Sequence, residues 1–185
     1  MEIKKYKLTE EIIKVDNSIL YRIEALRDFN DVKKGDKGGF VEKEENLSQY
    51  GDSWVYDDAM VFGNAEVYYN ARVHDNAIVR GKAVVFDDAE VLDNAVVYDK
   101  AEIYGNARVF GNAEIGGDAK VESAADYIVF KNWWSSGRYF TWTRTNNMWK
   151  VGCFYGTGEQ LIEKAYNDSE KSGREYEKIV RYTKT

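Results

Sequence analysis

The sequence predicts a mainly β protein organised around a six-residue repeat, and three observations lead to this prediction. A β-branched residue recurs every six positions through twelve units, from Val55 to Val121. A small residue stands two positions before each of them, first Ser53 and then alanine throughout. Proline is absent from all 185 residues, which suits a chain made of hydrogen-bonded strands. Two columns kept in register over twelve units indicate a repeat architecture.

Residues 1–39 are predicted to form an N-terminal hairpin that caps the repeat. Two apolar runs, 12–15 and 19–26, flank a turn-forming cluster at residues 16–18. The glycine-rich segment 33–39 is predicted to be a loop, because its spacing fits no nucleotide-binding motif and no clear helix follows it. Val41 and Leu47 lie six residues apart and are expected to start an irregular first rung.

Residues 40–123 are predicted to form the repeat domain. Each unit is one short strand and a tight corner, so three units would close a triangular coil of eighteen residues. The pattern from Ser53 to Val121 resembles the hexapeptide-repeat proteins that form a left-handed parallel β-helix. The left hand is implied by this resemblance alone, since general chirality rules favour right-handed crossovers. Twelve units predict about four coils.

Residues 124–185 are predicted to form a small C-terminal α+β domain that closes the other end of the β-helix, as solenoids require. Strands are expected at 126–131, 138–144 and 149–154. Leu161, Ile162 and Ala165 fit one helical face, and residues from Tyr176 onward suggest a second short helix.

Residues eighteen apart are expected to stack, which defines the outward columns of each face. The second face carries Met60, Ile78 and Val96 beside Phe62, Arg80 and Tyr98. A solvated face of an alternating strand should be more polar than this. We therefore expect either the C-terminal segment or another subunit to cover it. The third face carries an aromatic column, which consists of Tyr68, Phe86 and Tyr104.

The first face carries Arg72, Glu90 and Arg108, and the corner after it is acidic. Its residues include Asp57, Asp58, Asp75 and Asp93. Like charges at coil spacing destabilise one another, which suggests a functional edge that mimics a nucleic-acid backbone or holds a metal. The alternative is that Asp is placed there because it tolerates tight corners. We predict no metal site, because one histidine and one cysteine exclude multi-histidine sites and cysteine clusters.

The flanks carry a second resemblance. Segments 20–29, 38–42 and 46–48 resemble the entry segment of hexapeptide-repeat proteins that are common in phages and prophages. Segment 152–159 and the helix after it resemble the small closing domain found on the same proteins. The resemblance implies a mobile-element origin.

Hexapeptide proteins are best known as acyltransferases with a histidine as general base, and His74 is the only candidate here. It lies on an outward position between Arg72 and Asp75, and Asp75 could orient it. The repeat lacks the loop insertion that builds an acceptor pocket in such enzymes, and Cys153 fits a buried structural residue. The sequence therefore predicts a non-enzyme without a cofactor, and acyltransferase is the one enzyme class with any support.

The function predicted from the sequence is non-catalytic binding. Net charge is −6, which favours a protein partner with a basic surface over nucleic acid itself. With the phage resemblance, we predict a host factor such as a CRISPR effector nuclease as the blocked partner. Trp133, Trp134 and Arg138 are further interface candidates, because Trp and Arg are common anchors.

Two other predictions concern the oligomeric state and the cellular location. The chain is expected to form a homo-oligomer, and a structural component of a phage particle is the third functional alternative. No apolar run approaches the roughly 20 residues of a membrane span, so a cytoplasmic location in the host cell is predicted.

Overall fold

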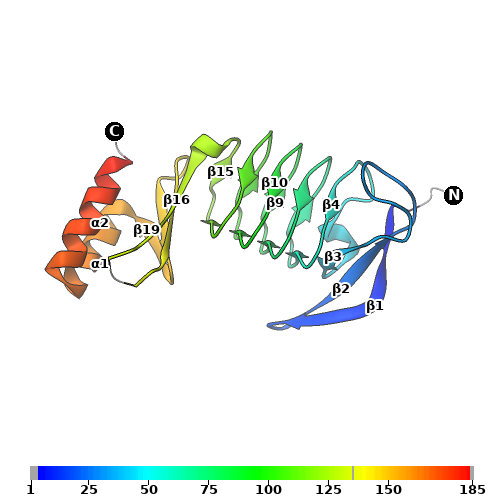
Figure 1. The fold of residues 1–185 in the computed structure, drawn as a ribbon, viewed down its shortest axis with the longest axis horizontal. Coiled ribbons are helices and arrows are strands. Elements are labelled where there is room, and N and C mark those ends of the chain that lie inside the picture. Colours follow the sequence, from blue (N-terminus) through cyan, green and yellow to red (C-terminus); the bar gives the residue numbers. More distant parts are fainter. Residues whose placement is uncertain (1–3, 135, 184–185) are drawn as a thin grey trace.

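The structure is a computed structural model that describes residues 4–134 and 136–183. A long three-sided prism occupies the middle of the molecule, with a β-hairpin at its N-terminal end and a small α+β domain at its C-terminal end (Figure 1). Within the described residues, no helix is both long enough and apolar enough to cross a membrane.

The prism is built from twelve two-residue strands, one for each repeat unit. They are β4 (Trp54–Val55), β5 (Met60–Val61), β6 (Glu66–Val67), β7 (Arg72–Val73), β8 (Ile78–Val79), β9 (Val84–Val85), β10 (Glu90–Val91), β11 (Val96–Val97), β12 (Glu102–Ile103), β13 (Arg108–Val109), β14 (Glu114–Ile115) and β15 (Lys120–Val121). Every third strand belongs to the same parallel sheet, and partners lie eighteen residues apart, as Glu90 does from both Arg72 and Arg108. The predicted triangular coil of eighteen residues is confirmed.

The repeat pattern has a direct physical cause. The inward alanines and valines are fully buried in the prism interior, from Ala59 through Val121, where only small side chains fit at the corners. The corners turn through residues with positive φ, such as Asp75 at 56° and Gly81 at 77°. This conformation is costly for most side chains and is tolerated by Gly, Asp and Asn.

The N-terminal segment extends one face of the prism. Strands β1 (Tyr6–Val15) and β2 (Ser18–Ala25) form the predicted hairpin, and β3 (Lys37–Val41) pairs in parallel with β5. These strands and the second face form one seven-stranded sheet, β1-β2-β3-β5-β8-β11-β14. With β3, five parallel strands stack on this face, and Leu47 bridges to Val67 on the next. The solenoid therefore has about five turns, not four.

The prediction of a loop over 33–39 is wrong at its C-terminal end, because β3 begins at Lys37. The glycines of β3 allow its backbone to lie close to the prism. A Cβ at Gly39 would lie 2.4 Å from the carbonyl oxygen of Ala59 and 2.6 Å from Cγ1 of Val55. Any side chain there would push β3 off the first coil. A short 3-10 helix, η1 (Glu44–Asn46), then leads into Leu47.

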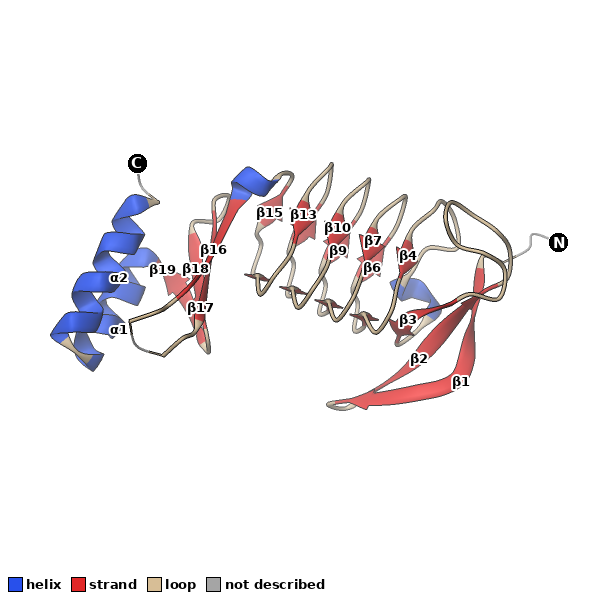
Figure 2. Cartoon of the chain, in the orientation of Figure 1, coloured by secondary structure: helices blue, strands red, loops and turns tan. Residues whose placement is uncertain are grey.

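The C-terminal domain is a four-stranded antiparallel sheet with two helices packed on it (Figure 2). After η2 (Ala124–Asp126), the sheet contains β16 (Tyr127–Lys131), β17 (Tyr139–Thr143), β18 (Met148–Val151) and β19 (Phe154–Thr157), and the helices are α1 (Gly158–Asp168) and α2 (Glu170–Tyr182). The strand predicted over 149–154 is in fact two strands, because the chain turns at Gly152, whose φ is 56°. The core of the C-terminal domain includes Phe140, Trp149 and Leu161.

Candidate functional site

A pocket of about 940 Å³ lies between the prism and the C-terminal sheet. It lies at the corner that follows the second face, and we call it the second-corner pocket. Its walls are formed by Gly81, Lys82, Asp99, Lys100, Gly117, Asp118, Lys120, Thr145, Asn146, Met148 and Tyr155.

Two lysines stand at the same corner position of consecutive coils. The backbone N–H of Lys82 donates to the carbonyl of Asp99 at 2.6 Å, and that of Lys100 donates to Gly117 at 2.8 Å. These bonds fix the two backbones, while both side chains are exposed. Among the ion pairs of the described residues, none uses Lys82 or Lys100, whereas Lys120 is paired with Glu102 at 3.0 Å. Two unpaired cations are therefore stacked at the pocket.

The carboxylates of the pocket are already engaged. Oδ2 of Asp99 accepts a hydrogen bond from the N–H of Gly117 at 3.3 Å. Oδ1 of Asp118 accepts one from the amide of Asn146 at 3.2 Å. The two carboxylates accept these hydrogen bonds from neutral groups, whereas the ammonium groups of Lys82 and Lys100 have no ion-pair partner among the described residues, in a chain whose net charge is −6. The arrangement favours an anionic ligand.

The opposite wall of the pocket is held firmly against the last coil. The Tyr155 hydroxyl donates to the carbonyl of Gly116 at 3.1 Å and accepts from the amide of Asn146 at 3.2 Å. Burial raises the pKa of Tyr155, so its phenol stays protonated at neutral pH. Met148 and the Tyr155 ring add apolar surface. A ligand with a charged end and an apolar arm matches these two walls.

His74, the predicted general base, lies elsewhere. It is half-buried at the end of the first face, and its ring stacks on Tyr56 with centroids 4.4 Å apart and planes within 6°. Burial lowers the pKa of His74, so the imidazole is neutral at pH 7. Asp75 forms no hydrogen bond to the imidazole among the described residues. Its carboxylate instead accepts a hydrogen bond from the N–H of Asp93 at 3.1 Å. The predicted His74–Asp75 pair is not assembled.

The acidic corner has a structural role. Oδ2 of Asp57 accepts from the N–H of Asp75 at 3.3 Å, and Oδ2 of Asp93 accepts from the N–H of Gly111 at 2.9 Å. With the Asp75–Asp93 bond, each carboxylate reaches the backbone of the next coil. Asp57, Asp75 and Asp93 also have positive φ values of 50°, 56° and 60°. The column of like charges is therefore offset by hydrogen bonds between coils.

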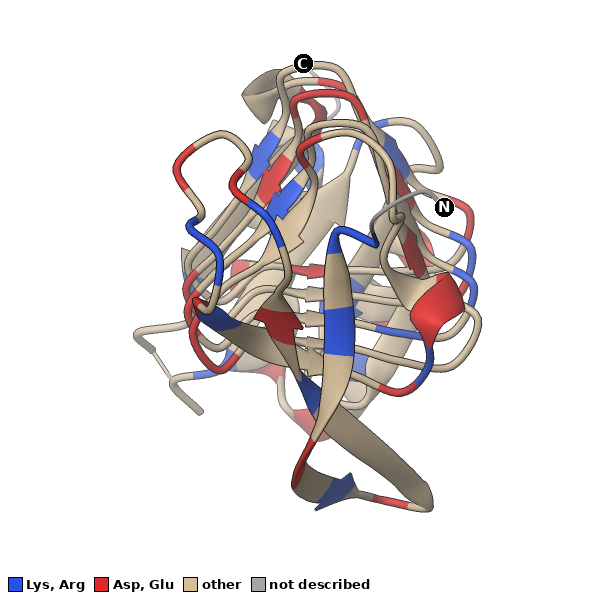
Figure 3. Ribbon diagram, turned by 90° about the vertical axis from the view of Figure 1, so that its right-hand side faces the viewer, with Lys and Arg blue, Asp and Glu red and all other residues tan. Residues whose placement is uncertain are grey.

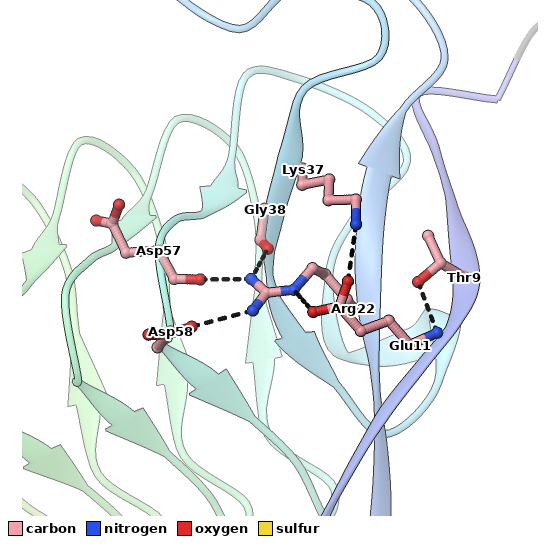
Figure 4. Close-up of polar contacts among 7 residues, drawn as sticks. All are labelled: Thr9, Glu11, Arg22, Lys37, Gly38, Asp57 and Asp58. Atoms are coloured by element: carbon pink, nitrogen blue, oxygen red, sulfur yellow. Dashed lines mark hydrogen bonds and ion pairs between the residues drawn. The ribbon is translucent and has the colours of Figure 1, made fainter.

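Asp58 belongs to a cluster that fastens the hairpin to this corner (Figure 4). The Arg22 guanidinium donates to Oδ1 of Asp58 at 3.1 Å, to the carbonyl of Asp57 at 2.9 Å and to that of Gly38 at 2.8 Å. Its Nε donates to Oε1 of Glu11 at 2.6 Å. The cluster fixes the hairpin relative to the prism.

Substitutions of Asp75 test the corner role. Asp75→Ala should lower the free energy of unfolding by about 1 kcal/mol, because alanine loses the bond to Asp93 and tolerates positive φ poorly. Asp75→Asn keeps an acceptor and the αL tolerance, so it should be close to neutral. Urea denaturation of both variants measures the difference. Equal losses for Asn and Ala would show that the charge itself matters.

The second face is covered at its C-terminal end. Tyr98 is 9% exposed and its ring packs against Gly116, where a Cβ would lie 2.2 Å from it. At the same end, Thr141 of β17 accepts a hydrogen bond from the N–H of Glu114 at 3.0 Å. The C-terminal domain thus covers the end at Tyr98. Among the other predicted residues of this face, Arg80 is exposed. The half-buried ones are Met60, Phe62, Ile78 and Val96.

The aromatic column of the third face is a continuous stack. The rings of Tyr68 and Phe86, and of Phe86 and Tyr104, have centroids 5.3 Å apart in both cases, with interplanar angles of 15° and 9°. The ring faces pack against one another, so the column presents ring edges at its surface.

The two adjacent tryptophans have different surroundings. Trp133 is 86% exposed, whereas Trp134 packs edge-on against Tyr176 of α2 with centroids 5.9 Å apart. Arg138 is exposed. Trp133 and Arg138 are therefore accessible, and Trp134 is part of the domain's packing.

Sequence reasoning missed the second-corner pocket. The signal was present, because Lys82 and Lys100 are eighteen residues apart at a corner position that is Asn or Asp in the other units from Asp58 to Asp118. The opposite wall comes from residues 145–155, which the period does not place.

The repeat also matches known proteins. Residues 101–117 match a family described as the YdcK beta solenoid repeat. Over 61 residues the chain is 38% identical to the uncharacterized acetyltransferase YdcK of Escherichia coli (strain K12). This match covers 29% of the chain and 19% of that protein, so it spans about a fifth of the relative's length. The similarity confirms the predicted hexapeptide-repeat β-helix.

Proposed function

We propose that the second-corner pocket binds the anionic donor of an acyl-transfer reaction, for which acetyl-CoA is the reference compound. The observation that carries the proposal is the pair of unpaired lysines, Lys82 and Lys100, on consecutive coils beside the pocket. The similarity of the repeat to a protein described as an acetyltransferase supports the choice of donor. The proposal departs from the non-enzyme predicted from the sequence.

The pocket's two walls suit the two parts of such a donor. Phosphate groups would lie against the ammonium groups of Lys82 and Lys100, where charge-assisted hydrogen bonds are strong. The apolar arm would follow Met148 and the Tyr155 ring toward the thioester. A pocket of about 940 Å³ lies within the size range of cofactor sites.

Transfer needs a base in addition to the donor site. The acceptor's amine or hydroxyl attacks the thioester carbonyl, the C–S bond breaks, the thiolate takes up a proton, and a base removes the acceptor's proton. The neutral imidazole of His74 is suited to this role. His74 lies at the end of the first face, whereas the pocket lies at the corner after the second face. Because these are different edges of one prism, a site that uses both would combine two copies of the chain.

Charge reversal tests the donor site. The double variant Lys82→Glu/Lys100→Glu should weaken acetyl-CoA binding at least about tenfold, because two attractive contacts become repulsive. Isothermal titration calorimetry measures the affinity. The matched control, Lys164→Glu/Lys171→Glu, changes the same charge on exposed lysines of α1 and α2. Failure of the native chain to bind acetyl-CoA, or equal weakening by both double variants, would contradict the proposal.

Catalysis is tested separately. Thiol release from acetyl-CoA with amine and hydroxyl acceptors should fall to background in His74→Ala. Binding without thiol release would limit the site to donor binding and reject transfer.

The prediction of a protein partner has less structural support. Trp133, at 86% exposure, and the exposed Arg138 are suited to an interface. No contact of the described residues favours a CRISPR effector over another partner. The CRISPR effector, the phage or prophage origin, the structural role in a phage particle and the cytoplasmic location stay predictions.

A further inference from the structure

The positive charge beside the second-corner pocket extends beyond its two free lysines. In Figure 3, which looks along the prism from its N-terminal end, Lys and Arg (blue) and Asp and Glu (red) occur on faces and corners alike. An anion is therefore attracted most where a cation lacks an ion-pair partner. Arg80, two positions before Lys82, is exposed, and no ion pair of the described residues includes it.

Arg80 and the lysines approach one turn of the prism from two sides. Arg80 ends the second face, Gly81 makes the turn with a φ of 77°, and Lys82 follows it. Because Gly81 has no side chain, only exposed backbone lies between the two cations. Lys100 occupies the position of Lys82 on the next coil, about 4.8 Å along the prism.

The guanidinium of Arg80 is held on an aromatic ring. Its Cζ lies 5.1 Å from the centroid of the Tyr98 ring, which is within the range of a cation–π interaction. The ring is itself fixed, because Tyr98 is 9% exposed. Lys150 also lies near this ring, at 6.0 Å, but it is paired with Glu114 at 3.3 Å. Arg80 is therefore positioned by packing while its charge stays available.

Arg80 also makes the charge of this corner positive. Arg80, Lys82 and Lys100 have no ion-pair partner among the described residues, and they outnumber the two carboxylates of the pocket, Asp99 and Asp118. A ligand that carries several phosphates gains a charge-assisted contact from each of the cations.

The positions of the cations match the order of groups in CoA, the carrier of the proposed donor. CoA has a diphosphate in its middle, the acyl-bearing arm on one side and an adenosine with a 3′-phosphate on the other. Met148 and Tyr155, which would accept the arm, belong to the C-terminal domain. Lys82 and Lys100 form one column and would hold the diphosphate. Arg80, on the other side of the turn, is then the cation left for the third phosphate.

We infer that Arg80 binds the 3′-phosphate of the donor, so that the site distinguishes CoA from dephospho-CoA, which lacks this group. The inference rests on the proposed donor site. A guanidinium is suited to a terminal phosphate, because its planar fork can donate two parallel hydrogen bonds. No ion pair among the described residues has to break for Arg80 to do so.

A cycle of two ligands and two proteins tests the inference. Isothermal titration calorimetry gives the dissociation constants of CoA and dephospho-CoA for the native chain and for Arg80→Ala. Loss of the 3′-phosphate should raise the dissociation constant of the native chain on the order of tenfold, and Arg80→Ala should raise that of CoA by a similar factor. Dephospho-CoA should bind both proteins equally, because it lacks the group that Arg80 contacts.

Lys82→Ala is the matched control, because it removes a cation assigned to the diphosphate. It should weaken the binding of CoA and dephospho-CoA by the same factor, and unchanged circular dichroism checks the folding of both variants. Equal affinity of the native chain for the two ligands, or equal weakening of both by Arg80→Ala, would overturn the inference while the donor site stands. A native chain that binds neither ligand would overturn the donor site as well.

Discussion

Replacing Trp54 with alanine should lower the free energy of unfolding by about 3–5 kcal/mol, as for other buried large aromatic residues. Trp54 is 1% exposed. Its ring meets Phe29 edge-on with centroids 5.3 Å apart and Tyr6 with centroids 6.1 Å apart. Removal would leave a cavity where the first coil meets its cap. Equilibrium urea denaturation, followed by far-UV circular dichroism, measures the loss.

The size of this effect follows from where Trp54 lies. A solenoid buries its apolar interior by stacking coils, so its first coil needs a separate cover. Trp54 begins the first face, and Tyr6 and Phe29 come from the N-terminal segment that covers it. The variant should therefore detach the cap and expose the end of the prism. Hydrogen exchange should rise first in β4 and in the β1–β2 hairpin.

Trp133→Ala is the matched control, because it removes the same side chain from an exposed position. Trp133 is 86% exposed, and surface substitutions of this kind stay within about 0.5 kcal/mol. Similar losses in the two variants would contradict the capping role of Trp54.

Trp54 also shows what the sequence could and could not predict. The period places Ala59, Val61 and their equivalents inside the prism, because inward positions follow from the two-residue alternation of a strand. Trp54 occupies an outward position by the same rule, and it pairs with Arg72. It is nevertheless buried, because the non-repeating N-terminal segment crosses it. The period predicts the prism well, while coverage by non-repeating segments is decided by tertiary contacts.

The same limit applies to the candidate site. The sequence shows the acidic corner as a column of aspartates, but it does not show that their carboxylates accept hydrogen bonds from the backbone of the next coil. Lys82 and Lys100 were readable as a pair, but the pocket beside them exists because Tyr155 and Asn146 fold back onto Gly116. Those contacts join residues about thirty to forty positions apart, without any repeat to relate them.

Lys5 is a buried charge that the sequence did not indicate. Its side chain is fully buried, and its Nζ donates to the carbonyl and the Oγ of Ser53 at 2.8 Å and 3.1 Å. The Phe29 ring lies 5.4 Å from Nζ. Burial, with a smaller contribution from the nearby Arg27, lowers the pKa of Lys5 to about 7, and Asp52 opposes the shift.

This pKa makes stability depend on pH in a stated direction. Between pH 7 and the ordinary lysine value of 10.5, the unfolded chain binds a proton that the folded chain has released. The free energy of unfolding should therefore rise with pH, by about 2–3 kcal/mol from pH 7 to 9. Tyr6, whose pKa is raised by burial, opposes this rise only as unfolded tyrosine begins to ionise near pH 10.

Urea denaturation of the native chain and of Lys5→Met at several pH values between about 7 and 9 tests this coupling. Methionine has a similar shape and no proton to lose, so the variant should show little slope over that window. Subtracting the two curves removes the contribution of every other titrating group. If the native chain and Lys5→Met have parallel curves, Lys5 keeps its proton in the fold, and the hydrogen bonds to Ser53 offset the cost of burying its charge.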